Sequence, residues 1–200
     1  MTIITIAGYG GSGKTLLGVI LTTYLKEKDY QVISNVKSYK YVDIDFETGI
    51  VGLINDIKKE GREQRKIMTK RVAFIDEIQN YLDSRESMKR KNIMLTQKIF
   101  QFRKYKIDMI CTLQDYLSMD VRLRRLTQYI MLPQFDEDEH ILSYVVLNGR
   151  TNEYLYEKKF FIPDNILELY DTYEDIDGDL DFSSEIANKK LKNSGFIIEK

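Results

Sequence analysis

Residues 8–15 read GYGGSGKT, a stretch that matches the pattern G-x-x-x-x-G-K-[ST]. It follows the apolar run of residues 3–7 and precedes LLGVILTTYLKEK, residues 16–28, which is typical of a helix. In this order of strand, loop and helix, glycines let backbone N–H groups turn inward around a phosphate, and the helix N-terminus adds further donors. The stretch therefore predicts a phosphate-binding loop. Its predicted binding residues are Gly8, Gly10, Gly11, Ser12, Gly13, Lys14 and Thr15.

Two side chains of this loop have distinct predicted roles. The ammonium of Lys14 neutralises the terminal phosphates of a nucleoside triphosphate, and the hydroxyl of Thr15 binds Mg²⁺. A GTPase would also need an Asn-Lys-x-Asp motif to read its base, and the nearest string, NKKL at residues 188–191, lacks the aspartate. We therefore expect ATP and Mg²⁺ as the cofactors.

A pair of adjacent carboxylates, Asp76 and Glu77, ends the apolar run of residues 72–75. Like charges this close oppose each other's ionisation, so a chain rarely places them beside a buried strand without a cation or a proton to manage them. We predict that Asp76 orients the water shell of the Mg²⁺ held by Thr15, and that Glu77 polarises a water for in-line attack on the γ-phosphate. The alternative is a surface pair that caps the next helix.

Gln114 follows another apolar run, residues 107–113. If this strand inserts between the first strand and the strand that ends at Asp76, Gln114 reaches the γ-phosphate from the carboxyl edge of the sheet. It is then a predicted catalytic residue that senses the nucleotide. A lone glutamine can equally be a polar residue that caps a helix.

Arginines cluster in YLSMDVRLRRLTQ, residues 116–128. At helical spacing Arg122 and Arg125 share a face, and an arginine aimed across a subunit boundary would stabilise the charge that develops on a neighbour's nucleotide. A solvated basic helix explains the same pattern equally well. Arg85 and Arg103 are outside candidates for the same role.

Strand-like and helical patterns alternate along the first 130 residues, which predicts an α/β fold with a parallel sheet and helices on both faces. Helical spacing runs from Ile50 to Ile57 and again over residues 87–105. The strands are expected at residues 3–7, 31–34, 72–75, 107–113 and 129–132.

The pattern changes after Pro133. YVVLNG, from residue 144, and EYLYEKKFFIP, residues 153–163, predict two strands joined by a turn at Asn148 and Gly149, which form an antiparallel edge of the same sheet. We expect a single domain at residues 1–175, and an acidic loop with a C-terminal tail at residues 176–200.

Charge is distributed unevenly along the chain, although its formal net charge is only -1. Residues 58–125 hold 18 Lys and Arg against 9 Asp and Glu, whereas residues 134–185 hold 3 against 15. This suits a track for a polyanion or a head-to-tail subunit contact, and two solvated faces are an equal alternative. The one cysteine excludes a disulfide framework, and no apolar stretch is long enough for a membrane span, so we expect a soluble intracellular protein.

The order of GYGGSGKT, VAFIDEIQNYLDSR at residues 72–85, CTLQD at 111–115 and DVRLRRLTQYIM at 120–131 resembles the additional-strand P-loop ATPases of the FtsK/HerA superfamily. Within it, the arrangement looks most like the zonula occludens toxin-like and filamentous-phage assembly ATPases and the genome-packaging ATPases of membrane-containing viruses. By this resemblance Lys14 and Thr15 are the Walker A residues, Asp76 and Glu77 the Walker B pair, and Gln114 the sensor of the fourth strand.

The resemblance implies a motor that couples Mg²⁺-dependent ATP hydrolysis to DNA translocation, as a ring that is usually a hexamer. The lack of a transmembrane helix favours viral genome packaging, which implies double-stranded DNA, a portal or a membrane or capsid protein as partners, and a place in the host cytoplasm or the virion. Sequence-independent phosphate contacts are expected from basic residues that include Arg62, Arg65, Lys89, Arg90 and Lys91.

Three other functions stay open at this point. A small nucleotide or nucleoside kinase has a compatible phosphate loop, and residues 122–125 resemble the arginine-rich lid it would need. A phage-assembly or secretion ATPase would act on a virion rather than package DNA. An assembly protein that uses ATP as a structural switch is less favoured, because a switch does not need the base predicted at Glu77.

Overall fold

The computed structural model describes residues 1–46, 49, 52, 69–82, 97, 99–102 and 104–171. Several expectations lie outside these residues: most of the two helical patterns, the basic residues from 62 to 91, Arg85, Arg103, and the acidic loop and tail. Within the second helical pattern, residues 97 and 99–102 are helical. None of the helices in the described ranges is long and apolar enough to cross a membrane.

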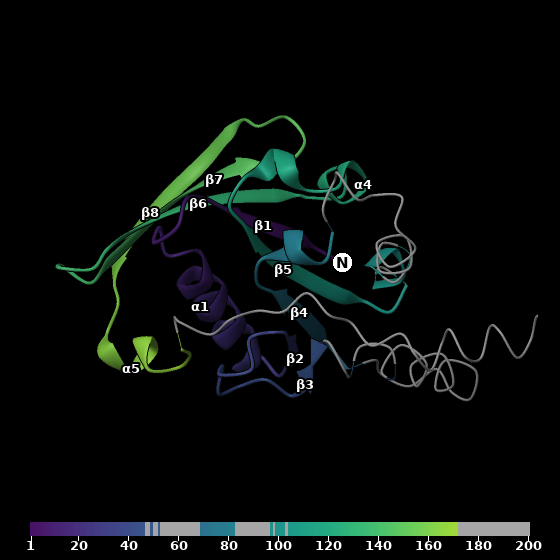
Figure 1. Ribbon diagram of the computed structural model, residues 1–200, viewed down its shortest axis with the longest axis horizontal. Coiled ribbons are helices and arrows are strands. Elements are labelled where there is room, and N and C mark those ends of the chain that lie inside the picture. The colour runs from purple at the N-terminus through teal and green to yellow at the C-terminus, as the bar shows by residue number, and fades with distance from the viewer. Residues whose placement is uncertain are drawn as a thin grey trace, which may run out of the picture.

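One sheet organises the described part of the chain (Figure 1). Its strands, in chain order, are β1 (Ile3–Ala7), β2 (Gln31–Ser34), β3 (Ile44–Asp45), β4 (Arg71–Ile75), β5 (Ile107–Leu113), β6 (Tyr129–Asp136), β7 (Ile141–Asn148) and β8 (Tyr154–Phe161). The helices are α1 (Lys14–Lys26), α4 (Val121–Arg124) and α5 (Asp164–Leu167), with short 3₁₀ turns η1 (Ile78–Asn80) and η3 (Tyr116–Ser118).

The strand order is β3-β2-β4-β5-β1-β6-β7-β8. The first six strands in this order, from β3 to β6, run parallel to one another. Strand β7 is antiparallel to β6, and β8 is antiparallel to β7. Strand β5 pairs with β1 on one side, where Ile3 lies opposite Met109, and with β4 on the other, where Ile75 lies opposite Cys111. Strand β5 therefore inserts between β1 and β4, which is the condition for the predicted position of Gln114, and the predicted fold class is confirmed.

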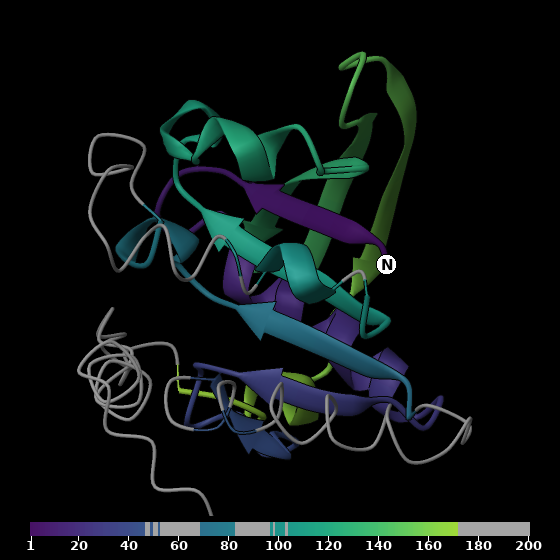
Figure 2. The same cartoon turned by 90° about the vertical axis from the view of Figure 1, so that its right-hand side faces the viewer.

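Two apolar layers cover the two faces of the sheet, because alternate residues of each strand point to opposite faces. Val72, Phe74 and Ile110 pack with α1 on one face, and Figure 2 shows α1 behind the central strands. Ala73 and Met109 face the other layer. There they meet buried side chains that include Ile99, Phe102, Met119 and Leu123.

Gly18 lets α1 approach the sheet closely. A Cβ at this position would lie 2.3 Å from Cε2 and 2.5 Å from Cζ of Phe74, whose side chain is fully buried. Gly18→Ala is expected to lower the free energy of unfolding by about 1–3 kcal/mol despite alanine's higher helix propensity, because a buried ring has little room to move.

Urea denaturation measures this effect, and the double variant Gly18→Ala/Phe74→Leu is its control. Leucine lacks the two ring atoms that clash, so the double variant should be less destabilised than the sum of the two single changes. Additive losses would show that the close contact does not limit the packing.

The predicted antiparallel hairpin is present as β7 and β8, and its first strand begins three residues earlier than predicted, at Ile141. The preceding strand, β6, was predicted to end at residue 132 and is also longer. Strand β6 continues through Pro133 to Asp136, because β1 pairs with β6 only as far as Met131 and the missing N–H of the proline therefore costs no ladder bond on that side. The loop after β7 is longer than a two-residue turn. Gly149 is needed there because a Cβ would lie 2.4 Å from the carbonyl oxygen of Thr127.

Candidate active site

The predicted phosphate loop joins the end of β1 to the start of α1. Gly11 and Gly13 have φ angles of 75° and 85°, which residues other than glycine rarely adopt. A Cβ on Gly13 would also lie 2.8 Å from Cβ of Phe135, so β6 packs against the loop from the side. Positions 10 and 11, by contrast, have no described atom within 4 Å of an added Cβ. The loop is therefore open on one side and held on the other.

Two polar groups of this loop lack the partner that a phosphate would supply. The hydroxyl oxygen of Ser12 is buried and forms no hydrogen bond with any described residue. The side chain of Lys14 is 9% exposed, and its ammonium donates to the carbonyl oxygen of Tyr9 at 2.8 Å. Burial lowers the pKa of Lys14, against the opposing charges of Asp76 and Glu77. These residues fit the phosphates of a nucleotide, since an anion would pair with the lysine and accept from the serine.

Thr15 and Asp76, the two predicted magnesium-site residues, contact each other. The hydroxyl of Thr15 donates to both carboxylate oxygens of Asp76, at 3.1 and 3.0 Å. Asp76 is 6% exposed, and burial raises its pKa, although hydrogen bonds from Thr112 and Thr15 act in the other direction. A buried carboxylate beside a hydroxyl fits a bound cation, which would compensate the charge.

The donor set indicates which cation fits. No cluster of three or more His, Cys, Asp or Glu side chains that could hold a metal occurs in the described ranges. One hydroxyl and one carboxylate suit Mg²⁺, which keeps several waters and takes its other ligands from phosphate oxygens. The residues present therefore fit Mg²⁺ bound together with a nucleotide.

Glu77 differs from its neighbour in both backbone and contacts. It has φ 48° and ψ 55°, a left-handed conformation that is rare for residues other than glycine, and it directly precedes the 3₁₀ turn η1. Its N–H donates to the hydroxyl of Thr112 at 2.9 Å, and its Oε2 accepts from Asn80 at 3.4 Å. The two adjacent carboxylates therefore have different surroundings, which the predicted division of roles requires.

Gln114 lies where the insertion of β5 predicts. It is exposed and directly follows β5, whose last residue, Leu113, accepts a hydrogen bond from the N–H of Gly8 at 3.3 Å. The carboxyl end of β5 thus adjoins the start of the phosphate loop, and the sensing role of Gln114 stays a prediction.

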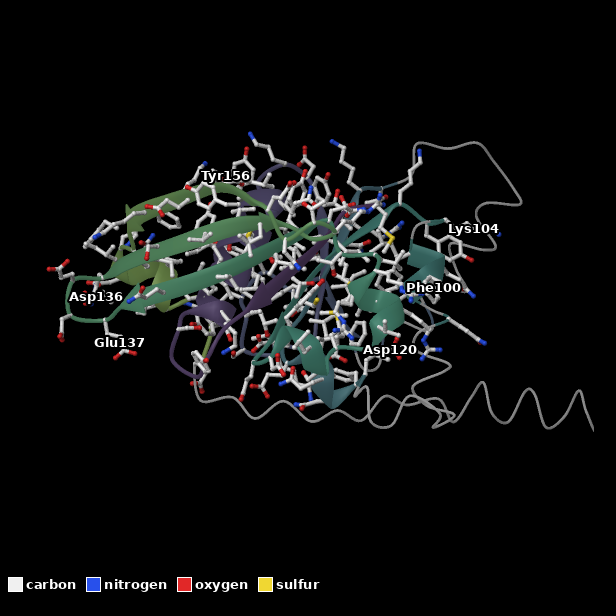
Figure 3. All side chains as sticks on the ribbon, turned by 90° about the horizontal axis from the view of Figure 1, so that it is seen from above. Phe100, Lys104, Asp120, Asp136, Glu137 and Tyr156 are labelled. Atoms are coloured by element: carbon white, nitrogen blue, oxygen red, sulfur yellow. The ribbon has the colours of Figure 1, made fainter. Side chains whose placement is uncertain are left out.

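The two candidate arginines lie at α4, away from the phosphate loop. Arg122 forms an ion pair with Asp120, with Nη2 2.6 Å from Oδ2, and Arg125 is exposed. Figure 3 shows Asp120 at the opposite end of the molecule from Asp136, which ends the strand that packs on the loop. The structure therefore does not bring these arginines to the chain's own loop, and their role in a neighbouring subunit stays a prediction.

Two buried polar residues that the sequence patterns did not single out contact the carboxylate pair. Thr112 donates a hydrogen bond to Oδ1 of Asp76, and Asn35 bonds both the N–H and the carbonyl oxygen of Asp76 at 2.8 Å. Each is a polar residue at the carboxyl end of a buried strand, and this position is the feature of the sequence that could have pointed to a role at the site.

Fold and site together define a P-loop NTPase fold of the additional-strand type. Among solved structures, the chain is similar to the N-terminal domain of zonular occludens toxin from Neisseria meningitidis, with a TM-score of 0.57, 16% identity, and coverage of 85% of this chain and 98% of that one. It is also similar to the genome packaging NTPase B204 of Sulfolobus turreted icosahedral virus 2, solved with ATP-gammaS, with a TM-score of 0.52, 12% identity, and coverage of 78% and 96%.

A DnaB-like replicative helicase matches more distantly, with a TM-score of 0.50, 10% identity, and coverage of 79% of this chain and 56% of that one. No protein-family profile and no curated protein matches the sequence. The first two structures are of the kinds that the sequence motifs resemble, so the resemblance is confirmed at the level of the fold.

Proposed function

We propose that this chain is a Mg²⁺-dependent ATPase that couples hydrolysis to the translocation of double-stranded DNA, in the packaging of a viral genome. The observation that carries the proposal is the arrangement of the carboxylate pair behind the phosphate loop. Asp76 shares a hydrogen bond with Thr15, whereas Glu77 faces different partners. A protein that only stores nucleotide needs the first carboxylate but has no use for the second.

The residues divide the work of hydrolysis. Lys14 leaves the carbonyl of Tyr9 to pair with the terminal phosphates, and backbone N–H groups of the loop orient them. Thr15 and Asp76 would hold Mg²⁺, which would neutralise phosphate charge when bound. Glu77 accepts a proton from the attacking water, and Gln114 contacts the γ-phosphate from the end of β5.

An arginine supplied by a neighbouring subunit completes the site in this proposal. Arg125 is the better placed of the two candidates, because Arg122 would first have to leave its ion pair with the largely buried Asp120. This requires a ring, proposed to be a hexamer, in which α4 of one subunit faces the phosphate loop of the next. The proposed partners beyond DNA are a portal or a membrane or capsid protein, and the proposed location is the host cytoplasm or the virion.

The DNA-binding part of the proposal is supported by charge and by the neighbours of the fold. Lys104 lies at the end of the molecule opposite to Asp136 and Glu137 (Figure 3), in keeping with the uneven charge of the sequence. Contacts between basic side chains and phosphates are independent of sequence and weaken steeply with salt. One structural neighbour is described as a genome packaging NTPase and another as a replicative helicase.

Steady-state ATP hydrolysis by the purified protein tests the proposal, with and without long double-stranded DNA and a panel of nucleoside acceptors. We expect DNA to raise the rate several-fold, and expect this stimulation to fall as salt increases, because phosphate contacts release counterions. Phosphate transferred to an acceptor, with DNA inert, would instead establish the kinase. Hydrolysis that DNA does not change, with no acceptor used, would retain the ATPase and remove the translocation.

A further inference from the structure

Strand β4 ends at Ile75, one residue before the carboxylate pair, and its neighbours continue the hydrogen bonding with side chains. Successive residues of a strand direct their N–H and C=O groups to opposite sides. Asp76 directs both groups toward β2, where Asn35, the residue after that strand, donates to its carbonyl oxygen and accepts from its N–H, each at 2.8 Å. The backbone of Asp76 is therefore held as if the sheet continued.

Glu77 directs its N–H to the other side, toward β5. There the hydroxyl of Thr112 accepts this N–H at 2.9 Å and donates its own proton to Oδ1 of Asp76. Thr112 is fully buried and is followed by Leu113, the last residue of β5. A single hydroxyl thus bonds the side chain of one carboxylate residue and the backbone of the other.

We propose that Thr112 is a positioning residue that couples the proposed metal-binding carboxylate of Asp76 to the proposed base Glu77. This inference rests on the proposed function, because it assigns Thr112 a part in that same site. Thr112 does not contact the reacting atoms; it acts through the two carboxylate residues. Asn35 supports Thr112 from the other side of β4. It bonds the carbonyl oxygen of Asp76, which belongs to the same peptide group as the N–H of Glu77 that Thr112 accepts.

The chemistry of a hydroxyl explains the choice of residue. Its one proton is given to the carboxylate, so its lone pairs remain free to accept the N–H of Glu77. That N–H belongs to a residue in a left-handed conformation, which persists only where the surroundings hold it. Valine has the same shape but neither capacity, and would leave a buried N–H without an acceptor and a buried carboxylate with one donor fewer.

The first arm of the test measures binding of a slowly hydrolysed fluorescent ATP analogue, with and without Mg²⁺, to the wild type, Thr112→Val and Thr112→Ser. In the valine variant we expect unchanged affinity without Mg²⁺ and a loss of about 10-fold or more in the gain that Mg²⁺ gives, because residues that orient a metal ligand contribute on this scale. The serine variant keeps the hydroxyl and should restore the Mg²⁺-dependent gain.

The second arm measures steady-state hydrolysis. Thr112→Val should lower kcat about 10–100-fold because it disturbs the base, and should raise KM for ATP with Mg²⁺ in line with the lost Mg²⁺-dependent affinity because it disturbs the metal ligand. Thr5→Val is the matched control: Thr5 is a fully buried threonine on the neighbouring strand β1, and its hydroxyl bonds Thr127 at 3.0 Å rather than the carboxylates. It should alter thermal stability and leave the Mg²⁺-dependent affinity unchanged.

The outcomes separate this inference from the proposed function. A wild-type Mg²⁺-dependent affinity and a wild-type kcat in Thr112→Val, or equal losses in Thr5→Val, would overturn the inference. The same is true if the serine variant is as impaired as the valine variant. If the wild type shows no turnover but Thr112→Val still loses the Mg²⁺-dependent affinity, the coupling to Asp76 stands and the proposed hydrolysis fails.

Discussion

Replacing Glu77 with glutamine is expected to lower kcat for ATP hydrolysis about 10²–10⁴-fold, the range that a general base contributes. Glutamine keeps the size of the side chain and can still bond Asn80, but it cannot accept a proton from the attacking water. The left-handed backbone of Glu77 and its N–H bond to Thr112 do not depend on the carboxylate, so the fold should be unchanged. Nucleotide affinity should stay within about threefold of the wild type, since the phosphate loop is intact.

Single-turnover hydrolysis together with equilibrium nucleotide binding measures both quantities on the same preparation. The control is the same chemical change at Glu157, an exposed residue on β8, which should have no effect on either quantity. If Glu77→Gln kept a rate within about threefold of the wild type, the water would be activated by another group and Glu77 would lose its assigned role.

The part of the fold that surrounds the phosphate loop was predictable because its signals are local. The glycine pattern, the apolar run before Asp76 and the apolar run before Gln114 each lie within a few consecutive residues. The rule that parallel strands collect their ligands at the carboxyl edge then brings these segments together without any knowledge of distant contacts. The insertion of β5 between β1 and β4 follows from the family resemblance and is observed in the sheet.

The features that sequence patterns missed depend on contacts between distant residues. Strand β3 has only two residues, too few for any periodicity, and it is defined by its pairing with β2. Gly149 is a hairpin signal, yet its need for glycine comes from the backbone of Thr127. Thr112 and Asn35 read as ordinary strand-end residues, and only the three-dimensional fold shows that both bond Asp76.

Asp76→Asn is expected to change activity and stability in opposite directions. Mg²⁺-dependent hydrolysis should fall at least about 10²-fold, because the amide is a poor ligand for a hard cation. The protein without nucleotide should melt about 2–8 °C higher, because a buried carboxylate without its cation is costly and the amide removes the charge while its oxygen still accepts from Thr15 and Thr112. Steady-state hydrolysis measures the first effect, and thermal melts with and without Mg²⁺ and ATP measure the second.

Asp43→Asn is the control with the opposite expected sign. Asp43 is partly exposed, forms an ion pair with Lys26 and accepts the N–H of Val32 at 2.7 Å, so its charge is favourable and the amide should lower the melting temperature. Wild-type protein should gain stability from Mg²⁺ and ATP together, whereas Asp76→Asn should gain much less, because stabilisation follows the affinity of the bound ligand. A lower melting temperature for Asp76→Asn without ligand would show that neighbouring groups already compensate the carboxylate in the empty site. The burial of Asp76 would then no longer argue for a bound cation.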